Sequence, residues 1–407
     1  MAHSRLLLVV PQFHSQSCEL KPAEVLEVGR TCRCTVGDPV LSTVPAADGN
    51  SSKWCELMTT RRRFRLGDNL APFRLLGVVL AGLAWSAGLP GLPAQEPPAR
   101  KPGEVPAQVS PEGVAYLEKL RRNTPFGTNG FDFEGLRRGM GTRRPLTVEG
   151  VVTKATKVGE IPAEWVLAPG ADPHVRLLYL HGGGFVSGSG GFYLPLAGHL
   201  SKAARCAVLL LDYRLAPEHP FPAGLDDCVA AHEWLRQHGP EGPAEARGTF
   251  IAGDSAGGNL SLATLLALRA KGRPLPQGVV SISPAADLTL ASESLQTVAD
   301  PIISSRTMPE FRKLYLGEHD PRDPLASPVF GDYRGVCPLL VQAGEHEMLR
   351  DDSTRVARKA RQDGATVHLE IWRGMFHVFQ SHDPLLPEGR EAVEHIARFL
   401  HDQLPAR

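Results

Sequence analysis

The stretch TFIAGDSAGG, residues 249–258, decides the fold of this chain. An apolar segment typical of a strand runs into a turn of small residues, and a helical pattern follows over residues 257–271. Strand-like and helical segments alternate in the same way along the neighbouring sequence. This alternation predicts an α/β fold, a mostly parallel eight-stranded sheet with helices on both faces. In such sheets the chemistry lies at the carboxyl ends of the strands.

Eight apolar or β-branched segments are predicted to be the strands: Leu146–Val158, Trp165–Ala168, Val175–Leu180, Ala207–Leu211, Thr249–Ala252, Val279–Ser283, Leu339–Ala343 and Val367–Trp372. Helical patterns predict helices over residues 110–122, 132–140, 193–204, 223–238, 257–271, 352–363 and 388–403. We expect Ser110 to cap the first helix and Pro111 to occupy its first turn.

The composition is that of a globular protein with a large core, because 42% of its 407 residues are hydrophobic and 22% are charged. The 44 basic and 44 acidic residues cancel, which argues against nucleic acid as the main partner. Seven cysteines, unevenly placed, do not form a disulfide framework. Cys32 and Cys34 lack the spacing of a zinc or redox pair, so we expect no metal and no cofactor.

The first hundred residues have a different composition from the rest. Residues 1–57 show no sustained period, and we expect them to be a non-native or disordered extension preceding a start at Met58. Residues 58–94 contain an arginine cluster, the apolar run 75–89 and a small-residue exit, which together are typical of a signal peptide. The alternative is an uncleaved membrane anchor, for which the run is short. Residues 95–108 are a proline-rich linker.

These segments predict an exported protein, periplasmic or secreted, without stable membrane insertion after cleavage. If residues 58–94 do not serve as a signal, the protein is expected to be cytoplasmic.

The first motif at a strand end is HGGGF, residues 181–185. Three glycines allow a tight turn that presents bare backbone N–H groups, and acyl transfer needs such donors for its oxyanion. The alternatives are a flexible glycine turn or a phosphate-binding loop. A phosphate loop would require a following Lys-Ser/Thr or a Gly-x-Gly-x-x-Gly frame, and neither is present.

The second motif is Gly-Asp-Ser-Ala-Gly, residues 253–257, between a strand and a helix. This arrangement is the nucleophile elbow, which exposes the hydroxyl of Ser255 and aims the N–H of Ala256 at the oxyanion. Its glycines are needed for a strained turn and for close strand–helix packing. The alternative is a purely structural Ser-Gly turn.

A nucleophilic serine needs a base, and His377 in the segment GMFHVF is the best candidate. It follows the last strand by a short loop and obeys the chain order serine, acid, histidine. His382 is the fallback. His368 lies within a strand and His395 on the last helix, so both fit less well.

HGGGF, GDSAGG and GMFHVF, with DYRLAPEHPFP over residues 212–222 between them, resemble the hormone-sensitive-lipase family of α/β-hydrolases, the bacterial family IV esterases. The resemblance covers about residues 110–403. It implies a catalytic domain over residues 146–407 and a serine esterase mechanism without a cofactor. A helical cap would come from residues 109–145 and an insertion at about 287–326.

The resemblance also assigns roles to single residues. Gly183, Gly184 and Ala256 would supply the N–H groups of the oxyanion hole. His181 and residues 212–222 would brace the loops around the site.

The catalytic acid departs from the usual pattern of this family, which has an aspartate a few residues past the strand-end glycine. In GEHEMLRDD, residues 344–352, Glu347 fills that place. A glutamate can equally accept the Nδ1 proton of histidine. Asp351 is the alternative acid, although with Asp352 and Ser353 it is expected to cap the following helix. Glu345 is a third candidate.

The residues therefore predict a serine carboxylic-ester hydrolase that acts on short- to medium-chain esters through a Ser-His-Glu triad and an acyl-enzyme. A lactone hydrolase, or an acetyl esterase of sugars or natural products, would use the same triad. A ligand-binding protein on the same fold is an alternative of another class. Plant gibberellin receptors resemble this family but lack the catalytic histidine, whereas Ser255 and His377 are both present here. The expected partner is a small-molecule ester.

Overall fold

The computed structural model describes residues 105–382 and 386–405. The predictions for residues 1–57 and 58–94, and for most of the linker 95–108, lie outside the described residues. Within the described part of the chain, no helix combines the length and the apolar character needed to cross a membrane.

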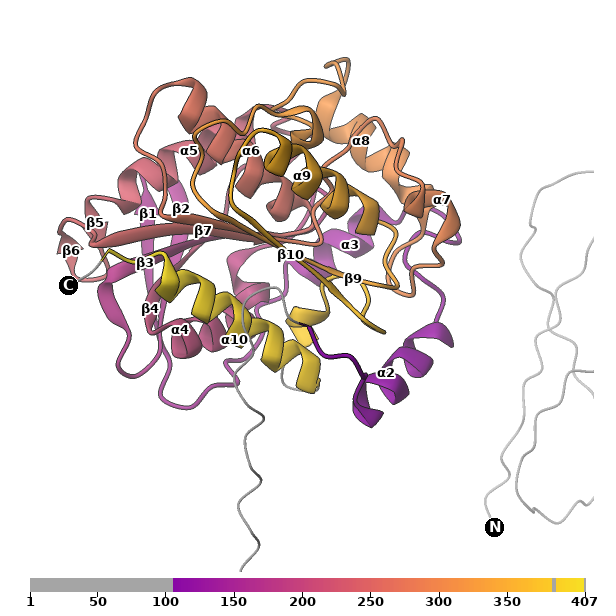
Figure 1. Ribbon diagram of the computed structural model, residues 1–407, viewed down its shortest axis with the longest axis horizontal. Helices are drawn as coiled ribbons and strands as arrows, with labels where there is room; N and C mark the ends of the chain where they lie inside the picture. Colours follow the sequence, from indigo (N-terminus) through magenta and orange to yellow (C-terminus); the bar gives the residue numbers. More distant parts are fainter. Residues whose placement is uncertain (1–104, 383–385, 406–407) are drawn as a thin grey trace, which may run out of the picture. The chain divides into compact units, whose positions relative to one another are not determined.

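One eight-stranded sheet forms the centre of the fold, in the order β1-β2-β4-β3-β7-β8-β9-β10 (Figure 1). Its strands are β1 (Val152–Val158), β2 (Ile161–Leu167), β3 (Asp172–Leu180), β4 (Cys206–Leu211), β7 (Gly248–Asp254), β8 (Gly278–Ile282), β9 (Leu339–Gly344) and β10 (Val367–Trp372). Strand β2 is antiparallel to both of its neighbours, and all other pairs from β4 to β10 are parallel. The prediction of a mostly parallel, eight-stranded sheet is confirmed.

Helices cover both faces of the sheet, as the alternating pattern requires. Figure 1 shows α5 (Ala223–Leu235), α6 (Ala256–Ala270) and α9 (Arg350–Gln362) on one face. The opposite face carries α4 (Leu194–Ala204) and α10 (Pro387–Asp402). Each layer has its own apolar core against the sheet, because central strands are buried on both sides.

Some predicted boundaries are wrong, each for a local reason. The first strand begins at Val152 and not at Leu146, because Val151 N–H donates to Val148 O in a turn whose Gly150 has φ +74°. Helix α5 ends at Leu235, because the chain then forms a small hairpin of β5 (His238–Gly239) and β6 (Gly242–Pro243).

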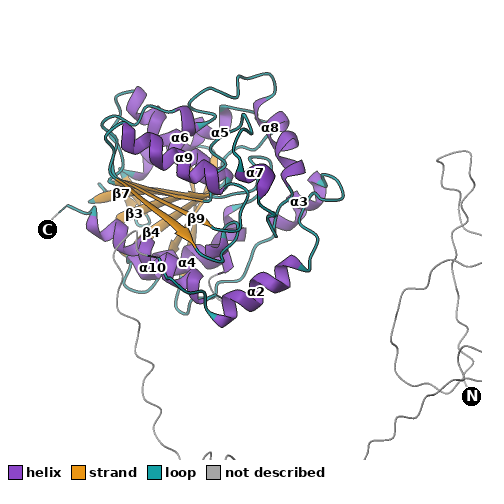
Figure 2. Cartoon of the chain, turned by 45° about the vertical axis from the view of Figure 1, so that its right-hand side comes forward, coloured by secondary structure: helices purple, strands orange, loops and turns teal. Residues whose placement is uncertain are grey.

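Two segments outside the sheet and its layers bear on the site. The first contains α2 (Pro111–Arg121) and α3 (Phe133–Met140), and Ser110 caps α2 as predicted by accepting from Gly113 N–H. The second, between β8 and β9, contains α7 (Ser294–Thr297), η2 (Ser305–Thr307) and α8 (Met308–Leu316). Figure 2 shows α2, α3, α7 and α8 along one side of the molecule.

Three further short 3-10 helices lie in connections, η1 (Gly190–Tyr193), η3 (Pro328–Phe330) and η4 (Phe379–His382).

Candidate active site

Ser255 lies in a sharp turn between strand β7 and helix α6, with φ 54° and ψ −116°. An L-residue rarely adopts this conformation, so the turn is strained as the elbow motif predicts. The flanking glycines allow close packing. A Cβ on Gly257 would lie 1.9 Å from the carbonyl oxygen of Leu180, and one on Gly253 would lie 2.3 Å from that of Gly257. Larger residues would push the helix away from the sheet.

His377 lies in the loop after β10, and its Nε2 is 3.1 Å from Ser255 Oγ. The structure therefore brings the predicted nucleophile and base together from segments 122 residues apart. Burial lowers the pKa of His377, while the negative charge of Asp300 acts in the opposite direction. The imidazole is therefore neutral at neutral pH and able to accept a proton.

Glu347 follows strand β9, and its Oε2 lies 3.9 Å from His377 Nδ1. This oxygen accepts hydrogen bonds from Ser283 Oγ at 2.7 Å and from Gly344 N–H at 3.1 Å. Ser283 also accepts from Val378 N–H, so its hydroxyl joins the acid loop to the histidine loop. Burial raises the pKa of Glu347 to about 8, against the effect of the Ser283 hydrogen bond.

The other acids of this loop have different partners. Asp351 Oδ2 accepts from the N–H of Ser294, and Glu345 Oε2 accepts from the N–H of Gly374. The expectation that Asp351, Asp352 and Ser353 cap the next helix is wrong. Helix α9 already starts at Arg350, without a side-chain cap, because Asp352 instead accepts from the N–H groups of Ala286 and Asp287.

The fallback base His382 also lines the cavity above Ser255, but its Nδ1 lies 2.8 Å from Tyr116 Oη. Burial lowers the pKa of His382 to about 4.

The glycine loop lies beside the nucleophile. Gly183 and Gly184 line the same cavity as Ser255 and have φ values of 121° and 64°, which only glycine adopts readily. Gly184 lies directly beneath Phe311 of α8, since a Cβ on it would be 2.4 Å from that ring. Ala256 is the buried first residue of α6.

Asp254 is a site residue to which sequence reasoning gave no role, although it stands inside the elbow motif. Its Oδ1 accepts from Gly182 N–H at 3.1 Å and from Tyr179 Oη at 2.8 Å, and Oδ2 accepts from Tyr193 Oη. Burial raises the pKa of Asp254 to about 6, against these hydrogen bonds. The carboxylate thus connects the elbow to the glycine loop.

His181 and Tyr213 lie behind the glycine loop. Their rings stack at a centroid distance of 4.3 Å, and Tyr213 Oη donates to the carbonyl oxygen of His181. Arg214 donates to the buried carboxylate of Asp227, which holds the segment 212–222 against α5. These contacts are structural and do not reach the cavity.

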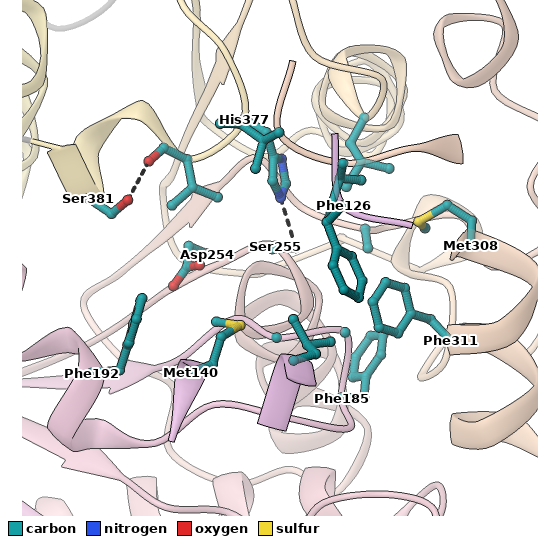
Figure 3. Close-up of a pocket in the computed structure, with 18 of the residues that line it drawn as sticks. Phe126, Met140, Phe185, Phe192, Asp254, Ser255, Met308, Phe311, His377 and Ser381 are labelled. Atoms are coloured by element: carbon teal, nitrogen blue, oxygen red, sulfur yellow. Dashed lines mark hydrogen bonds between the residues drawn. The ribbon is translucent and has the colours of Figure 1, made fainter. Parts of the chain in front are cut away.

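The cavity above Ser255 has a volume of about 240 Å³ and apolar walls. Figure 3 shows Phe126, Phe185 and Phe311 on one side of the Ser255–His377 pair and Met140 and Phe192 on the other. Both segments expected to form a cap contribute to the wall, through Phe126, Leu136, Met140, Leu288, Ile302, Ile303, Met308 and Phe311. Across residues 105–382 and 386–405 we found no cluster of His, Cys, Asp or Glu that could hold a metal ion.

Comparison with known proteins gives a consistent result. The profile of a family described as "alpha/beta hydrolase fold" matches residues 177–381. An acetyl-hydrolase of Streptomyces hygroscopicus is 43% identical over 246 residues, 60% of this chain and 80% of the relative. An esterase of Acinetobacter venetianus is 37% identical over 226 residues, 55% of this chain and 73% of the relative. The crystal structure of an esterase from the bacterial hormone-sensitive lipase family is 40% identical, with a TM-score of 0.66, covering 73% of this chain and all of its own.

Proposed function

Because this chain belongs to the hormone-sensitive-lipase family of α/β-hydrolases and is a carboxylic-ester hydrolase, we propose that Ser255, His377 and Glu347 are its catalytic triad. The observation that carries the proposal is the 3.1 Å approach of His377 Nε2 to Ser255 Oγ at the wall of an apolar cavity. A nucleophile and a base within hydrogen-bond reach are the signature of covalent acyl transfer.

In the proposed mechanism, His377 takes the proton of Ser255 as Oγ attacks the ester carbonyl. The developing oxyanion is stabilised by the N–H groups of Gly183, Gly184 and Ala256, and one such donor typically contributes about 3–4 kcal/mol. His377 then gives the proton to the leaving alcohol. A water molecule, activated by the same imidazole, attacks the acyl-enzyme and releases the acid.

Glu347 acts on His377 through Nδ1 and stabilises the imidazolium that forms in each step. Its Oε2 is held by Ser283 and Gly344, which supports the carboxylate position. The 3.9 Å separation from Nδ1 is long for a hydrogen bond. Catalytic hydrogen bonds of this kind often tighten only when the substrate binds.

We propose short- to medium-chain esters, acetyl esters among them, as the substrates. A cavity of about 240 Å³ is smaller than the ~300–1,000 Å³ typical of ligand pockets, which supports a preference for short acyl chains. The relative from Streptomyces hygroscopicus, named an acetyl-hydrolase, supports the short end of this range.

The test is hydrolysis of p-nitrophenyl esters with acyl chains of two, four, eight and sixteen carbons, together with a lactone panel. We expect the shorter chains to react and the sixteen-carbon ester to react poorly. Ser255→Ala should abolish the activity and keep the circular dichroism spectrum. More than about a tenth of wild-type activity in the folded variant would refute the serine mechanism.

We further propose that residues 58–94 direct export, on the basis of their arginine cluster, apolar run and small-residue exit. Amino-terminal sequencing of the native protein tests this, with a start near Gln95 expected. A purely cytosolic pool would refute it.

A further inference from the structure

Asp300, in the insertion between β8 and β9, is a buried carboxylate that joins two parts of the site. Its Oδ1 accepts from the N–H groups of Ile302 at 2.8 Å and Ile303 at 3.2 Å. Its Oδ2 accepts from the N–H of Met348 at 3.1 Å. One side chain therefore fastens a turn of the insertion to the loop that carries Glu347.

The first end of this connection is a wall of the substrate cavity. Ile302 and Ile303 both line the cavity. The wall is also paired with the amino-terminal segment, because Phe126 N–H donates to Ile302 O and Ser304 N–H donates to Phe126 O. An acyl group bound in the cavity would contact this wall, and the hydrogen bonds to Asp300 fix the position of the wall.

The second end is the peptide group next to the proposed catalytic acid. Met348 directly follows Glu347, so a hydrogen bond to Met348 N–H fixes the peptide plane from which the Glu347 side chain starts. Among the described residues, Glu347 Oε1 and His377 Nδ1 have no hydrogen-bond partner. A shift of about 1 Å decides whether the carboxylate at 3.9 Å bonds to the imidazole, so the position of this backbone matters.

We propose that Asp300 is a positioning residue for Glu347, which fastens the acid loop to the cavity wall and keeps the carboxylate within reach of His377 while the acyl group is bound. This proposal rests on the triad proposed above. The charge of Asp300 works in the same direction, because it opposes the effect of burial on the pKa of His377 and so favours the imidazolium.

The test compares Asp300→Asn with wild type in the full chain. The asparagine oxygen can still accept from Ile302 and Ile303, but its amide then faces Met348 N–H and the bond to the acid loop is lost. We expect kcat on p-nitrophenyl butyrate to fall about 10- to 100-fold, with KM within about threefold. Stoichiometric phosphonylation of Ser255 counts the folded sites, so a partly unfolded preparation does not distort kcat.

Two further variants isolate the effect. Asp300→Glu keeps a carboxylate and should retain more kcat than Asp300→Asn. Asp320→Asn is the matched control, because Asp320 is an exposed aspartate of the same insertion whose carboxylate, within the described part of the chain, accepts only from Arg322 N–H. Its kcat and KM should be those of wild type.

A double-mutant cycle distinguishes positioning from general structure. If Asp300 acts through Glu347, then Asp300→Asn should lower kcat little further in a Glu347→Gln background. Fully additive losses, or a change in KM alone, would overturn the proposal. If Glu347→Gln itself leaves kcat unchanged, the proposed triad fails. If Glu347→Gln lowers kcat and Asp300→Asn does not, only the role of Asp300 fails.

Discussion

Among the residues that the structure describes, two histidine–glutamate pairs are buried, and the one with the better hydrogen-bond geometry is not at the candidate site. His395 Nδ1 lies 2.8 Å from Glu370 Oε1, and both side chains are fully buried. Glu370 Oε2 also accepts from Gln342 Nε2 and Trp372 Nε1. His377 and Glu347 are 3.9 Å apart.

The surroundings separate the two pairs. His377 faces a hydroxyl in a strained turn, a glycine loop and a cavity, whereas His395 is enclosed between α10 and the sheet. The tight hydrogen bond between His395 and Glu370 is therefore explained by their burial, because buried polar side chains are nearly always hydrogen-bonded. Among the described residues, His395 Nε2 also has no hydrogen-bond partner, but in the looser pair both members have an unpartnered atom, Glu347 Oε1 and His377 Nδ1. The transfer of a proton to the His377 imidazole can engage these two atoms.

The largest expected difference between the pairs comes from removing each imidazole. His377→Gln should lower kcat/KM at least ~10⁴-fold, because the proton of Ser255 then has no acceptor. His395→Gln should keep kcat/KM within about threefold of wild type and lower the melting temperature. Hydrolysis of p-nitrophenyl butyrate and thermal unfolding measure the two effects. A large loss of activity in folded His395→Gln would break the distinction.

Removing each carboxylate should give the next largest difference. Glu347→Gln is expected to lower kcat about 10³-fold, because the imidazolium loses its counter-charge. Glu370→Gln should leave kcat nearly unchanged but destabilise the fold by about 1–3 kcal/mol, since an amide then faces a hydrogen-bond donor. Denaturant unfolding and kcat, measured on both variants, check this. If Asp351→Asn lost ~10³-fold while Glu347→Gln stayed near wild type, the acid would be Asp351.

A smaller effect is expected in the pH dependence of the reaction. Burial raises the pKa of Glu347 to about 8 and lowers that of His377. The working pair needs an ionised carboxylate beside a neutral imidazole, so kcat/KM should rise about tenfold between pH 7 and pH 9. The rise should persist in Glu370→Gln and vanish in Glu347→Gln. A wild-type profile that is already flat at pH 7 would contradict it.

The last expected effect is on stability as a function of pH, and it does not involve the rate of reaction. The raised pKa means that Glu347 binds its proton more tightly in the folded chain than in the unfolded one, where the ordinary value is 4.5. The resulting stability is complete below pH 4.5 and is lost as pH rises towards 8. Relative to wild type, Glu347→Gln should therefore gain stability between pH 5 and pH 8, on the order of 3 kcal/mol.

Melting temperatures of wild type, Glu347→Gln and Glu370→Gln, measured at pH 5 and at pH 8, check this prediction. Glu370→Gln should be destabilised at both pH values, because its cost comes from lost hydrogen bonds. If the stability of wild type and of Glu347→Gln changed with pH in the same way, the pKa of Glu347 would not be raised by burial.

Local sequence determined the architecture. The period of apolar residues and the glycine turns of the two motifs act within a few residues of one another, so the strands, the helices and the strained turn at Ser255 could be predicted from the chain alone. Chain order pointed to His377, which the fold brings within hydrogen-bond distance of Ser255.

Only the tertiary structure decided which carboxylates meet the imidazole. Glu345, Glu347 and Asp351 lie within one short loop, and their spacing does not say which of them points inward. A hydrogen bond from Ser283, which directly follows strand β8, holds Glu347 towards His377, and a hydrogen bond from Ser294 holds Asp351 elsewhere. Asp300 does not belong to any sequence motif. Its role depends on contact between the insertion and the loop that carries Glu347, which the pairing of β8 with β9 brings together. Such contacts depend on distances between loops, which local patterns do not encode.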